Sequence, residues 1–574
     1  MNKREKFFKI LKFTSVFLAV QNAIFFFAMK CCWSGLSSFL KYGSNHIEFL
    51  YYLPPIVSGL FFILAITSII LYLIKDKTRN IWPIIVLSLD LIETAIIIAV
   101  TIFGAIDYLY FIIPDFITYS LIAGFLYFIA YFMFIYPKKE RKTKNIIKGI
   151  TFGSMVVVLS ITLLNLTINS FSTKPVVYAV EDTYQIVFST SSESIGYVKI
   201  NNKTYADTYA GSYENSKIHK IIVPQKDLDE AKNYEIYSQK MFYKGPFGGF
   251  KGREIKESFA FRPVNSSDGI SYYSLADIHM EKNGSIKASS YLENKDFLVL
   301  AGDIISMVDS FSNANYVNKV ASEITKGEIP VIYARGNHEI KGKWADKLYK
   351  FVGSKNQNFY YYFTLGNSVY GWTLDIGEDH DDNWWEYYGT ADFETYRDEQ
   401  ISFLKEERDK GTYLSYPYHL VVCHIPLPFI NSRKNHEESK KEFISILNEL
   451  DIDMEISGHQ HDLFIFEPGL ITPNEQLKYN IEYDGKGKTY KGYLLDFNFP
   501  TFLVSKRGLT QTDDAKLAYS HNQIGFNVQV DSSFTNEIVY YNNVNGEKVD
   551  VVNPFFDKKY GDTITIDLAT KSFN

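Results

Sequence analysis

The sequence predicts a multidomain protein with a five-helix transmembrane region, a small β-sandwich and an α/β domain. Three observations support this fold class. Long apolar runs dominate residues 1–170, short runs of β-forming residues fill residues 175–263, and polar motifs follow buried strand-like runs between residues 265 and 510. A chain of 574 residues is long enough for several domains.

Five apolar runs predict five transmembrane helices, because each approaches or exceeds the roughly 20 residues that a helix needs to cross a bilayer. They occupy residues 7–29, 49–74, 81–105, 109–136 and 147–169. Lys and Arg gather before the first run, after the second and between the last two. Since basic loops stay in the cytoplasm, we expect a multi-pass protein of the cytoplasmic membrane. Its N terminus would be cytoplasmic, and the domains after the fifth span would be extracellular or periplasmic.

Two features of this region leave alternatives open. A cleaved secretory peptide is the alternative for the first run, although the segment 28–31 lacks the small residues of a cleavage site. Asp90, Glu93 and Asp115 lie inside the predicted spans, where charged groups usually face the interior of a helix bundle. They fit an ion path, a lipid headgroup site, a conformational relay or a structural hydrogen-bond cluster.

Residues 175–263 predict a small β-sandwich that acts as a spacer. Runs of Tyr, Val, Ile and Thr alternate here with polar interruptions, which is typical of short antiparallel strands. The candidate strands are residues 184–190, 195–200, 218–223, 234–238 and 257–261.

Five polar motifs in the next segment each follow a buried strand-like run. The runs are residues 272–276, 297–301, 331–334, 420–423 and 452–456. The motifs are Asp277-Ile278-His279, Gly302-Asp303, Gly336-Asn337-His338-Glu339, His424 and Gly458-His459-Gln460-His461. Side chains at the ends of successive strands can converge on one site, so we expect these motifs to meet.

The residue types of the motifs predict a site for two divalent metal ions. Asp, His and Asn supply oxygen and nitrogen ligands, which suit Mn, Fe or Zn. A carboxylate that bridges two ions also holds a shared hydroxide, which is a nucleophile at neutral pH. Asp303 is the candidate bridge. This ligand set indicates hydrolysis of a phosphate ester.

The order of the motifs resembles the calcineurin-like metallophosphoesterase superfamily over residues 265–510. The resemblance implies a four-layer fold of two mixed sheets flanked by helices. It also implies catalytic roles for Asp303 and for His338, which would contact the phosphate and protonate the leaving oxygen. The implied metal ligands are Asp277, His279, Asp303 and His461 for one ion, and Asp303, Asn337, His424 and His459 for the other.

One relative within the superfamily allows a finer comparison. Purple acid phosphatases carry an iron-binding Tyr three residues after the bridging Asp, where this chain has Ser306. We therefore expect no coloured ferric centre. The β-rich segment that starts at Pro175 is similar in position to the fibronectin-like domain of those enzymes, and it would contribute one wall of the substrate cleft.

The substrate is less well defined by the sequence. Arg335 and Arg433 are candidates for binding the phosphate. The stretch from Asp379 to Asp382, followed by Trp384 and Trp385, either borders the cleft or forms a solvated loop. A net charge of −6 without a basic stripe argues against broad nucleic-acid binding. A small molecule, a lipid headgroup and a phosphoprotein all remain open as substrates, as do monoesters, diesters and pyrophosphates.

The remaining elements are predicted from periodicity. Helices are expected near residues 316–326, 395–409 and 437–450, where apolar residues recur at helical spacing. Residues 463–467, 493–497, 501–505, 526–530 and 538–541 are candidate strands, and residues 511–574 are expected to form a β-rich C-terminal extension. The high content of Lys, Asn, Ile and Tyr is typical of an AT-rich bacterial genome.

Taken together, these features predict a membrane-anchored, extracytoplasmic, dinuclear metal-dependent phosphoesterase with the lipid bilayer and a phosphate ester as partners. In-line attack by a metal-bridging hydroxide would cleave the ester. The alternative is a receptor or sensor that binds a phosphate ligand at a non-catalytic site of the same kind and signals through the five spans.

Overall fold

The computed structural model describes most of the chain after residue 168. After residue 168, the described residues are 169–245, 248–431, 436–469, 477–483, 486–505, 523–553 and 558–574. Before it, they are residues 5, 7–14, 16–17, 63, 66–67, 70 and 88. The chain divides into two compact units, one of residues 1–168 and 239–253, the other of residues 169–238 and 254–574. The motifs all belong to the second unit.

The predicted transmembrane region has to be corrected. In the part of the chain that the structure describes, no helix is both long and apolar enough to cross a membrane. This finding contradicts the five-helix region in the predicted fold class and the multi-pass localisation derived from it. The prediction rested on hydropathy, which measures the apolar character of a run and does not itself establish a continuous helix. Nearly all of the five runs, with Asp90, Glu93 and Asp115, lie outside the described residues.

The first large sheet contains three parallel strands that precede three of the motifs. They are β9 (Ile270–Leu275), β10 (Phe297–Ala301) and β11 (Pro330–Ala334), with Leu298 level with both Tyr273 and Val331. β10 and β11 are continuous apolar runs, whereas β9 includes two serines. All three strands are almost completely buried, as expected for parallel strands covered on both faces.

This sheet extends on both sides of the three parallel strands. β1 (Val176–Val180) pairs in parallel with β11, and β21 (Gly525–Val530) pairs antiparallel with β9. The full order is β27-β26-β22-β21-β9-β10-β11-β1-β2-β7-β8, with β3 and β6 paired to β2 and β23 paired to β22. The further bounds are β2 Thr183–Ile200, β3 Lys203–Ala206, β6 Ser216–Pro224, β7 Asn233–Gly245, β8 Gly248–Ala260, β22 Asn536–Asn542, β23 Lys548–Val549, β26 Ile564–Asp567 and β27 Ser572–Phe573.

The sheet therefore continues through the segment expected to form a fibronectin-like sandwich and through the C-terminal extension. Strand β1, from residues 175–263, belongs to this sheet and hydrogen-bonds directly to β11 of the segment that carries the motifs. The domain boundaries near residues 264 and 510 stay predictions, although hydrogen bonding of the sheet crosses both.

The second large sheet contains the strands that precede the other two motifs. Its order is β12-β13-β14-β16-β20-β17, and β13, β14, β16 and β20 are parallel. Its bounds are β12 Tyr361–Leu365, β13 Val369–Leu374, β14 Tyr418–Cys423, β16 Met454–Ser457, β17 Ile465–Phe466 and β20 Thr501–Leu503. Smaller pairings join β15 (Phe429–Asn431), β19 (Lys486–Leu494) and β18 (Leu477–Tyr483), then β4 (Thr208–Tyr209) with β5 (Ser212–Tyr213), and β24 (Val551–Asn553) with β25 (Lys558–Tyr560).

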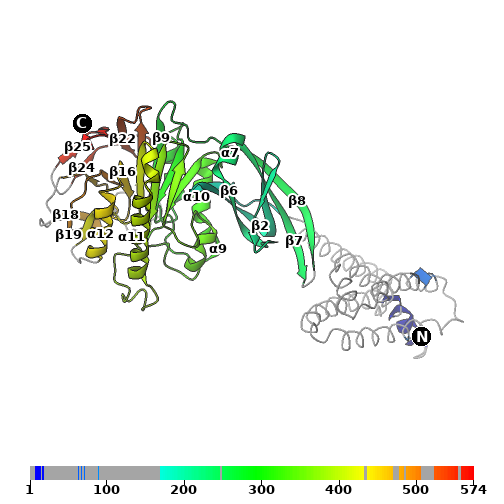
Figure 1. Cartoon of the computed structure of the whole chain (residues 1–574). Helices are drawn as coiled ribbons and strands as arrows, with labels where there is room; N and C mark the ends of the chain where they lie inside the picture. Colours follow the sequence, from blue (N-terminus) through cyan, green and yellow to red (C-terminus); the bar gives the residue numbers. More distant parts are fainter. Residues whose placement is uncertain are drawn as a thin grey trace. The chain divides into compact units, whose positions relative to one another are not determined.

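Three apolar cores join the sheets and helices into four layers. One core lies between the sheets, where Val299 of the first packs in the same cluster as Val422 and Ile456 of the second. A second joins the outer face of the second sheet to α11 (Phe393–Lys410) and α12 (Glu437–Leu447), which lie side by side in Figure 1. A third joins the first sheet to α8 (Lys282–Ser289) and α10 (Tyr316–Thr325).

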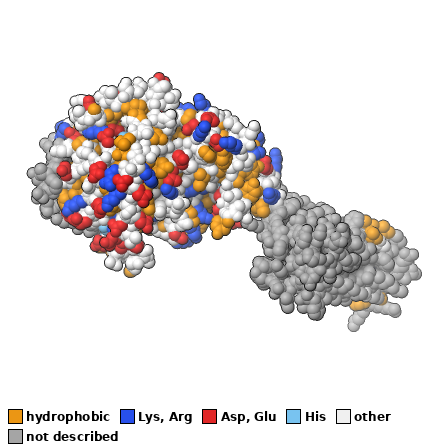
Figure 2. Space-filling model, viewed as in Figure 1, with side chains coloured by type: hydrophobic (Ala, Val, Ile, Leu, Met, Phe, Trp, Pro, Cys, Tyr) orange, Lys and Arg blue, Asp and Glu red, His pale blue; other side chains and the backbone are white. Residues whose placement is uncertain are grey.

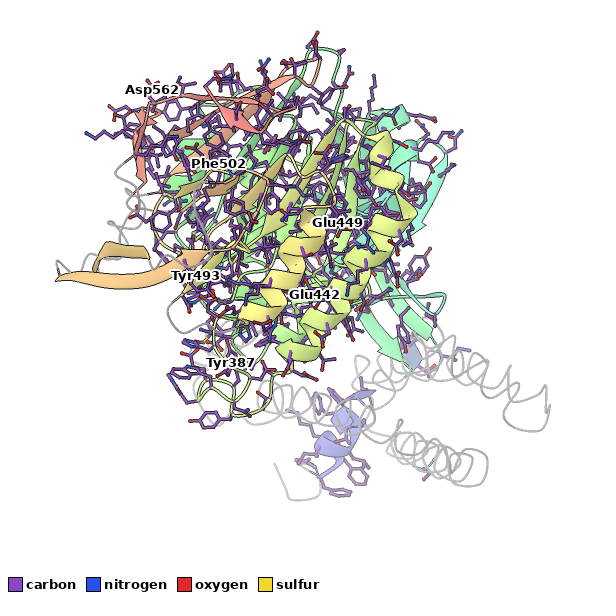
Figure 3. All side chains as sticks on the ribbon, turned by 60° about the vertical axis from the view of Figure 1, so that its left-hand side comes forward. Tyr387, Glu442, Glu449, Tyr493, Phe502 and Asp562 are labelled. Carbon is purple, nitrogen blue, oxygen red and sulfur yellow. The ribbon has the colours of Figure 1, made fainter. Side chains whose placement is uncertain are left out.

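Helix α11 begins and ends at conventional signals. The Asp392 side chain accepts a hydrogen bond from the Thr395 N–H at the start of α11, and Gly411 ends the helix in the left-handed conformation. Arg408 of α11 is 2.9 Å from Glu449, which follows α12 and is labelled in Figure 3. The other helical segments described after residue 168 are α7 Gln225–Ala231, α9 Phe311–Ala314, η2 Ala345–Lys350 and η3 Thr412–Ser415. On the face shown in Figure 2, basic and acidic side chains are interspersed.

Candidate metal centre

The five motifs meet at the carboxyl ends of parallel strands from both sheets. Asp277, Asp303 and Asn337 follow β9, β10 and β11 of the first sheet, whereas His424 and His459 follow β14 and β16 of the second. Since the two sheets pack face to face, these ends approach each other across the sandwich. The fold thus brings together residues that are up to 184 positions apart in sequence, from Asp277 to His461.

Most of these residues have strained backbones. Asp277, His279, Asp303, His459 and His461 all have positive φ angles, between 47° and 74°. Non-glycine residues adopt this left-handed region infrequently, and when they do so together they mark sites where function fixes the backbone. The sharp turns at the strand ends direct the side chains into a common space.

Two buried carboxylates form the centre of the site. The Asp303 Oδ2 atom is 3.2 Å from His424 Nε2, 3.7 Å from His279 Nε2 and 3.9 Å from His338 Nε2. The Asp277 Oδ1 atom is 3.6 Å from His461 Nε2. Three overlapping groups have ligand atoms within 4.8 Å of one another: Asp277, His279 and His461; His279, Asp303 and His338; and Asp277, Asp303 and His424.

Hydrogen bonds to backbone carbonyls determine which histidine nitrogens face this space. The Nδ1 of His424 donates to the Ala301 carbonyl at 2.8 Å, and the Nδ1 of His338 donates to the Ser306 carbonyl at 2.9 Å. A carbonyl oxygen only accepts, so Nδ1 carries the proton in both rings. The Nε2 atoms are therefore left to face Asp303.

The site passes a direct test of whether its residues fit metal ions. Asp277 Oδ1 and Asn337 Oδ1 are buried oxygen atoms that accept no hydrogen bond from the described residues. Leaving such atoms without a partner is costly, so their presence indicates an electropositive ligand. An oxygen- and nitrogen-rich donor set is also the chemistry that divalent Mn, Fe or Zn requires.

Glu339 fixes the loops around the centre. Its Oε2 accepts hydrogen bonds from the backbone N–H groups of Asp303 and Gly336, at 2.9 and 3.0 Å. Its Oε1 accepts from the N–H groups of Ile304 and Ile305. The last residue of the Gly-Asn-His-Glu motif thus holds the turn that carries Asp303, a role that the motif alone did not predict.

The charges of the site are strongly coupled. Burial opposes ionisation of Asp303, but His424 and His338 outweigh it and hold the pKa of Asp303 well below its usual range. Burial likewise lowers the pKa of His424, but the Asp303 carboxylate reverses this and raises that pKa to about 10. Bound divalent ions would replace these protons, because ligating histidines must be neutral.

Two acidic residues after β13 make contacts that sequence reasoning missed or left open. Glu378 accepts hydrogen bonds from the Asn337 amide, and its position after an apolar run was the available signal. Asp379, from the stretch expected either to border the cleft or to form a solvated loop, is 2.9 Å from His459 Nε2. Burial opposes the ionisation of Asp379, but His459 outweighs it and lowers the pKa of Asp379.

Of the two predicted phosphate-binding arginines, the structure describes Arg335. The Nε of Arg335 donates to Asp375 at 2.6 Å, and its guanidinium lies over the Phe359 ring at 4.5 Å. This side chain lines a cavity of about 330 Å³ together with Tyr396 and Phe393. Arg433 lies outside the described residues. Both assignments to the substrate stay predictions, and Arg335 already has a buried carboxylate partner.

The fold and the site define one arrangement: candidate metal ligands at the strand ends of two stacked sheets that helices flank on both sides. Residues 271–463 match the family model described as calcineurin-like phosphoesterase. No curated protein matches the chain. The described ligand groups and this match agree on the same segment.

Solved structures provide a further comparison. The chain is similar to purple acid phosphatase PPD1 from yellow lupin (Lupinus luteus) seeds, with 12% identity, a TM-score of 0.43, and coverage of 70% of this chain and 74% of that one. It is also similar to PhoD, with 11% identity, a TM-score of 0.40, and coverage of 71% and 92%.

The chain carries a calcineurin-like phosphoesterase domain, which confirms the family resemblance of its motifs. It is a metal-dependent phosphoesterase, with divalent metal ions as cofactors and phosphate esters as substrates.

Proposed function

We propose that the enzyme is dinuclear and hydrolyses phosphate esters by in-line displacement, with Asp303 shared between two divalent ions. The observation that carries this proposal is the environment of the Asp303 Oδ2 atom, which faces nitrogen atoms of His424, His279 and His338 within 3.9 Å. A single carboxylate oxygen surrounded in this way suits a ligand common to two neighbouring ions.

The remaining ligands divide between the two ions. Asp277, His279 and His461 would complete the first set, in agreement with the group that they form together. Asn337, His424 and His459 would complete the second, since the Asn337 Oδ1 atom is buried without a hydrogen bond. When bound, Mn, Fe or Zn ions would supply the positive charge that lowers the pKa of water and neutralises the phosphate.

We infer that His338 binds the phosphate and protonates the leaving oxygen. Its side chain retains 34% exposure, whereas Asp303 beside it has 1%. The Ser306 carbonyl fixes the proton on Nδ1, which directs Nε2 toward the reaction space. A ring held in this way can donate from Nε2 when protonated, which is the geometry that general acid catalysis requires.

The test uses the full chain, stripped with a chelator and reloaded with Mn, Fe(II) or Zn. Hydrolysis of p-nitrophenyl phosphate and bis-p-nitrophenyl phosphate is compared for wild type, Asp303→Ala and His459→Ala. Asp309→Ala, which removes an exposed carboxylate six positions after Asp303, is the matched control. We expect turnover to be lost in the two ligand variants and kept in the control.

Turnover that survives in the Asp303→Ala, His459→Ala double variant would refute the proposal. Tight binding of inorganic phosphate by the wild type without turnover of either ester would favour the phosphate-binding receptor instead.

A further inference from the structure

Two consecutive carboxylates after β13 contact two predicted ligands that come from different sheets. We propose that Glu378 and Asp379 are positioning residues that orient Asn337 and His459, and that they thereby set the affinity of the second metal ion. The inference rests on the proposed dinuclear function and deepens it, because it names what holds one of the two ion sites in shape.

Glu378 determines which end of the Asn337 amide faces the metal space. The Asn337 Nδ2 donates to both carboxylate oxygens of Glu378, at 3.2 and 3.0 Å. An ionised carboxylate only accepts, so the NH₂ end of the amide must face Glu378. The Asn337 Oδ1 atom then faces away from Glu378, and it is the buried oxygen that accepts no hydrogen bond.

Asp379 acts in the same way on His459. The Asp379 Oδ2 atom lies 2.9 Å from His459 Nε2, so the carboxylate fixes the proton on Nε2. The lone pair of the ring is thereby placed on Nδ1. The backbone N–H of His459 also donates to Asp277 Oδ2 at 2.9 Å, which fixes the main chain beneath the ring. Carboxylates that accept the outer N–H of a ligating histidine set its tautomer and its orientation.

The Glu378 carboxylate is itself held from several sides. It accepts the Tyr387 hydroxyl at 2.8 Å, and Lys341 Nζ lies 3.3 Å away. Tyr387 belongs to the loop that projects beyond the ends of α11 and α12 in Figure 3. Lys341 follows the Gly-Asn-His-Glu motif by two residues and also pairs with Glu386 of the same loop, at 2.8 Å.

Asp379 is anchored on its other side. It accepts a hydrogen bond from Asn431 Nδ2 at 3.2 Å, and the buried Lys440 Nζ lies 4.0 Å from its Oδ1. Lys440, on α12, donates to the Pro426 and Phe429 carbonyls in the segment after His424. The two carboxylates are therefore rigid supports, which is what positioning a ligand to within a fraction of an ångström requires.

The test measures Mn²⁺ binding to the metal-free full chain by calorimetry, with electron paramagnetic resonance to detect the coupled ion pair. Glu378→Ala and Asp379→Ala should each lower the affinity for the second ion about 10–100-fold, which is the usual effect of losing a hydrogen-bond partner of a metal ligand. The first ion should keep its affinity, and the coupled signal should diminish.

Conservative variants separate positioning from a merely structural role. In Asp379→Asn and Glu378→Gln, an amide oxygen can still accept the same hydrogen bond, so most of the affinity for the second ion should return. Asp381→Ala, an exposed acid of the same loop, is the matched control and should bind both ions like the wild type. Thermal unfolding checks that each variant is folded.

The inference would be overturned if both alanine variants bound the two ions with wild-type affinity. It would also be overturned if they lost affinity for the first ion as much as for the second. If an alanine variant fails to fold, Asp379→Leu or Glu378→Met takes its place, because each keeps the side-chain volume and removes the hydrogen-bond acceptor, and each should weaken binding of the second ion. If Asp379→Asn loses as much affinity for the second ion as Asp379→Ala does, each relative to the control Asp381→Ala, positioning by hydrogen bonding is contradicted. A wild type that binds only one ion would instead overturn the dinuclear proposal, which the wild-type titration identifies separately.

Discussion

Replacing Gly336 with alanine should damage the metal centre with very little chemical change. A β-carbon at this position would lie 2.6 Å from Glu339 Oε2 and closer still to the Asp303 carboxylate. The backbone of Gly336 is not in the left-handed region, so alanine meets no conformational penalty of its own. The perturbation is therefore steric and is aimed at the candidate bridging ligand.

The size of the effect follows from the contact distances. Ordinary van der Waals contact begins at 3.4 Å, so the Glu339 oxygen must move by about 0.8 Å (3.4 minus 2.6). That oxygen accepts the Asp303 N–H, so the turn carrying Asp303 must move with it. Overpacking of this kind costs about 1–3 kcal/mol of stability. A displacement near 1 Å at reacting groups lowers turnover about 100-fold.

The assay compares kcat/KM for bis-p-nitrophenyl phosphate, at saturating Mn²⁺, between wild type and Gly336→Ala. Gly561→Ala is the control, because the nearest atom to its added β-carbon is 3.8 Å away. Thermal unfolding of both variants measures the stability component. Gly336→Ala with wild-type turnover and wild-type stability would refute the idea that this close approach holds the metal centre in place.

Three further predictions follow from particular residues. His338→Ala should lower turnover more for an alkyl phosphate than for p-nitrophenyl phosphate, because a poor leaving group needs the proton; equal losses would argue against the acid role. Mn²⁺ at 100 times its dissociation constant should stabilise the metal-free chain by about 2.7 kcal/mol for each ion bound, and an unchanged melting temperature would contradict a folded-state site. Burial raises the pKa of Glu537 to about 8 from 4.5, so the folded chain holds a proton that the unfolded chain releases, and stability should fall as pH rises from about 4.5 to 8. Glu537→Gln should reduce this fall in a comparison of melting temperatures at pH 5 and pH 8, and an identical pH dependence in both proteins would disprove the assignment.

The strands and helices around the site were predictable because their sequence patterns are strong. The run 297–301 coincides with β10, and the run 331–334 lies within β11. Each is apolar on both faces and ends at a polar motif, which is the pattern of a parallel strand leading into a site. Helical spacing also located α11 and α12 to within a few residues.

Other features depend on contacts that a sequence does not display. The long strand β2 was expected as two strands, because serines interrupt its apolar pattern; the structure keeps one strand with a shift in register between Ser189 and Ser194. The strand pairing of β1 with β11 joins segments about 150 residues apart. Such pairing is decided by tertiary packing and not by local propensity.

The support of the ligands shows the same limit. The motif order placed Asn337 and His459 at the site, but nothing in the local sequence of Glu378 relates it to Asn337, 41 positions earlier. The transmembrane prediction was wrong for a different reason. The local hydropathy was strong, but no spanning helix is found among the described residues. Local patterns indicate what a segment prefers, whereas the partners of a buried polar group require the fold.

The most direct test of the account is a titration of the metal-free full chain with Mn²⁺ while the hydrolysis of bis-p-nitrophenyl phosphate and p-nitrophenyl phosphate is followed. We predict that turnover of at least one ester rises with added metal and reaches its maximum at two ions per chain. Two bound ions without turnover of either ester, or turnover that does not depend on metal, would contradict a dinuclear phosphoesterase centred on Asp303.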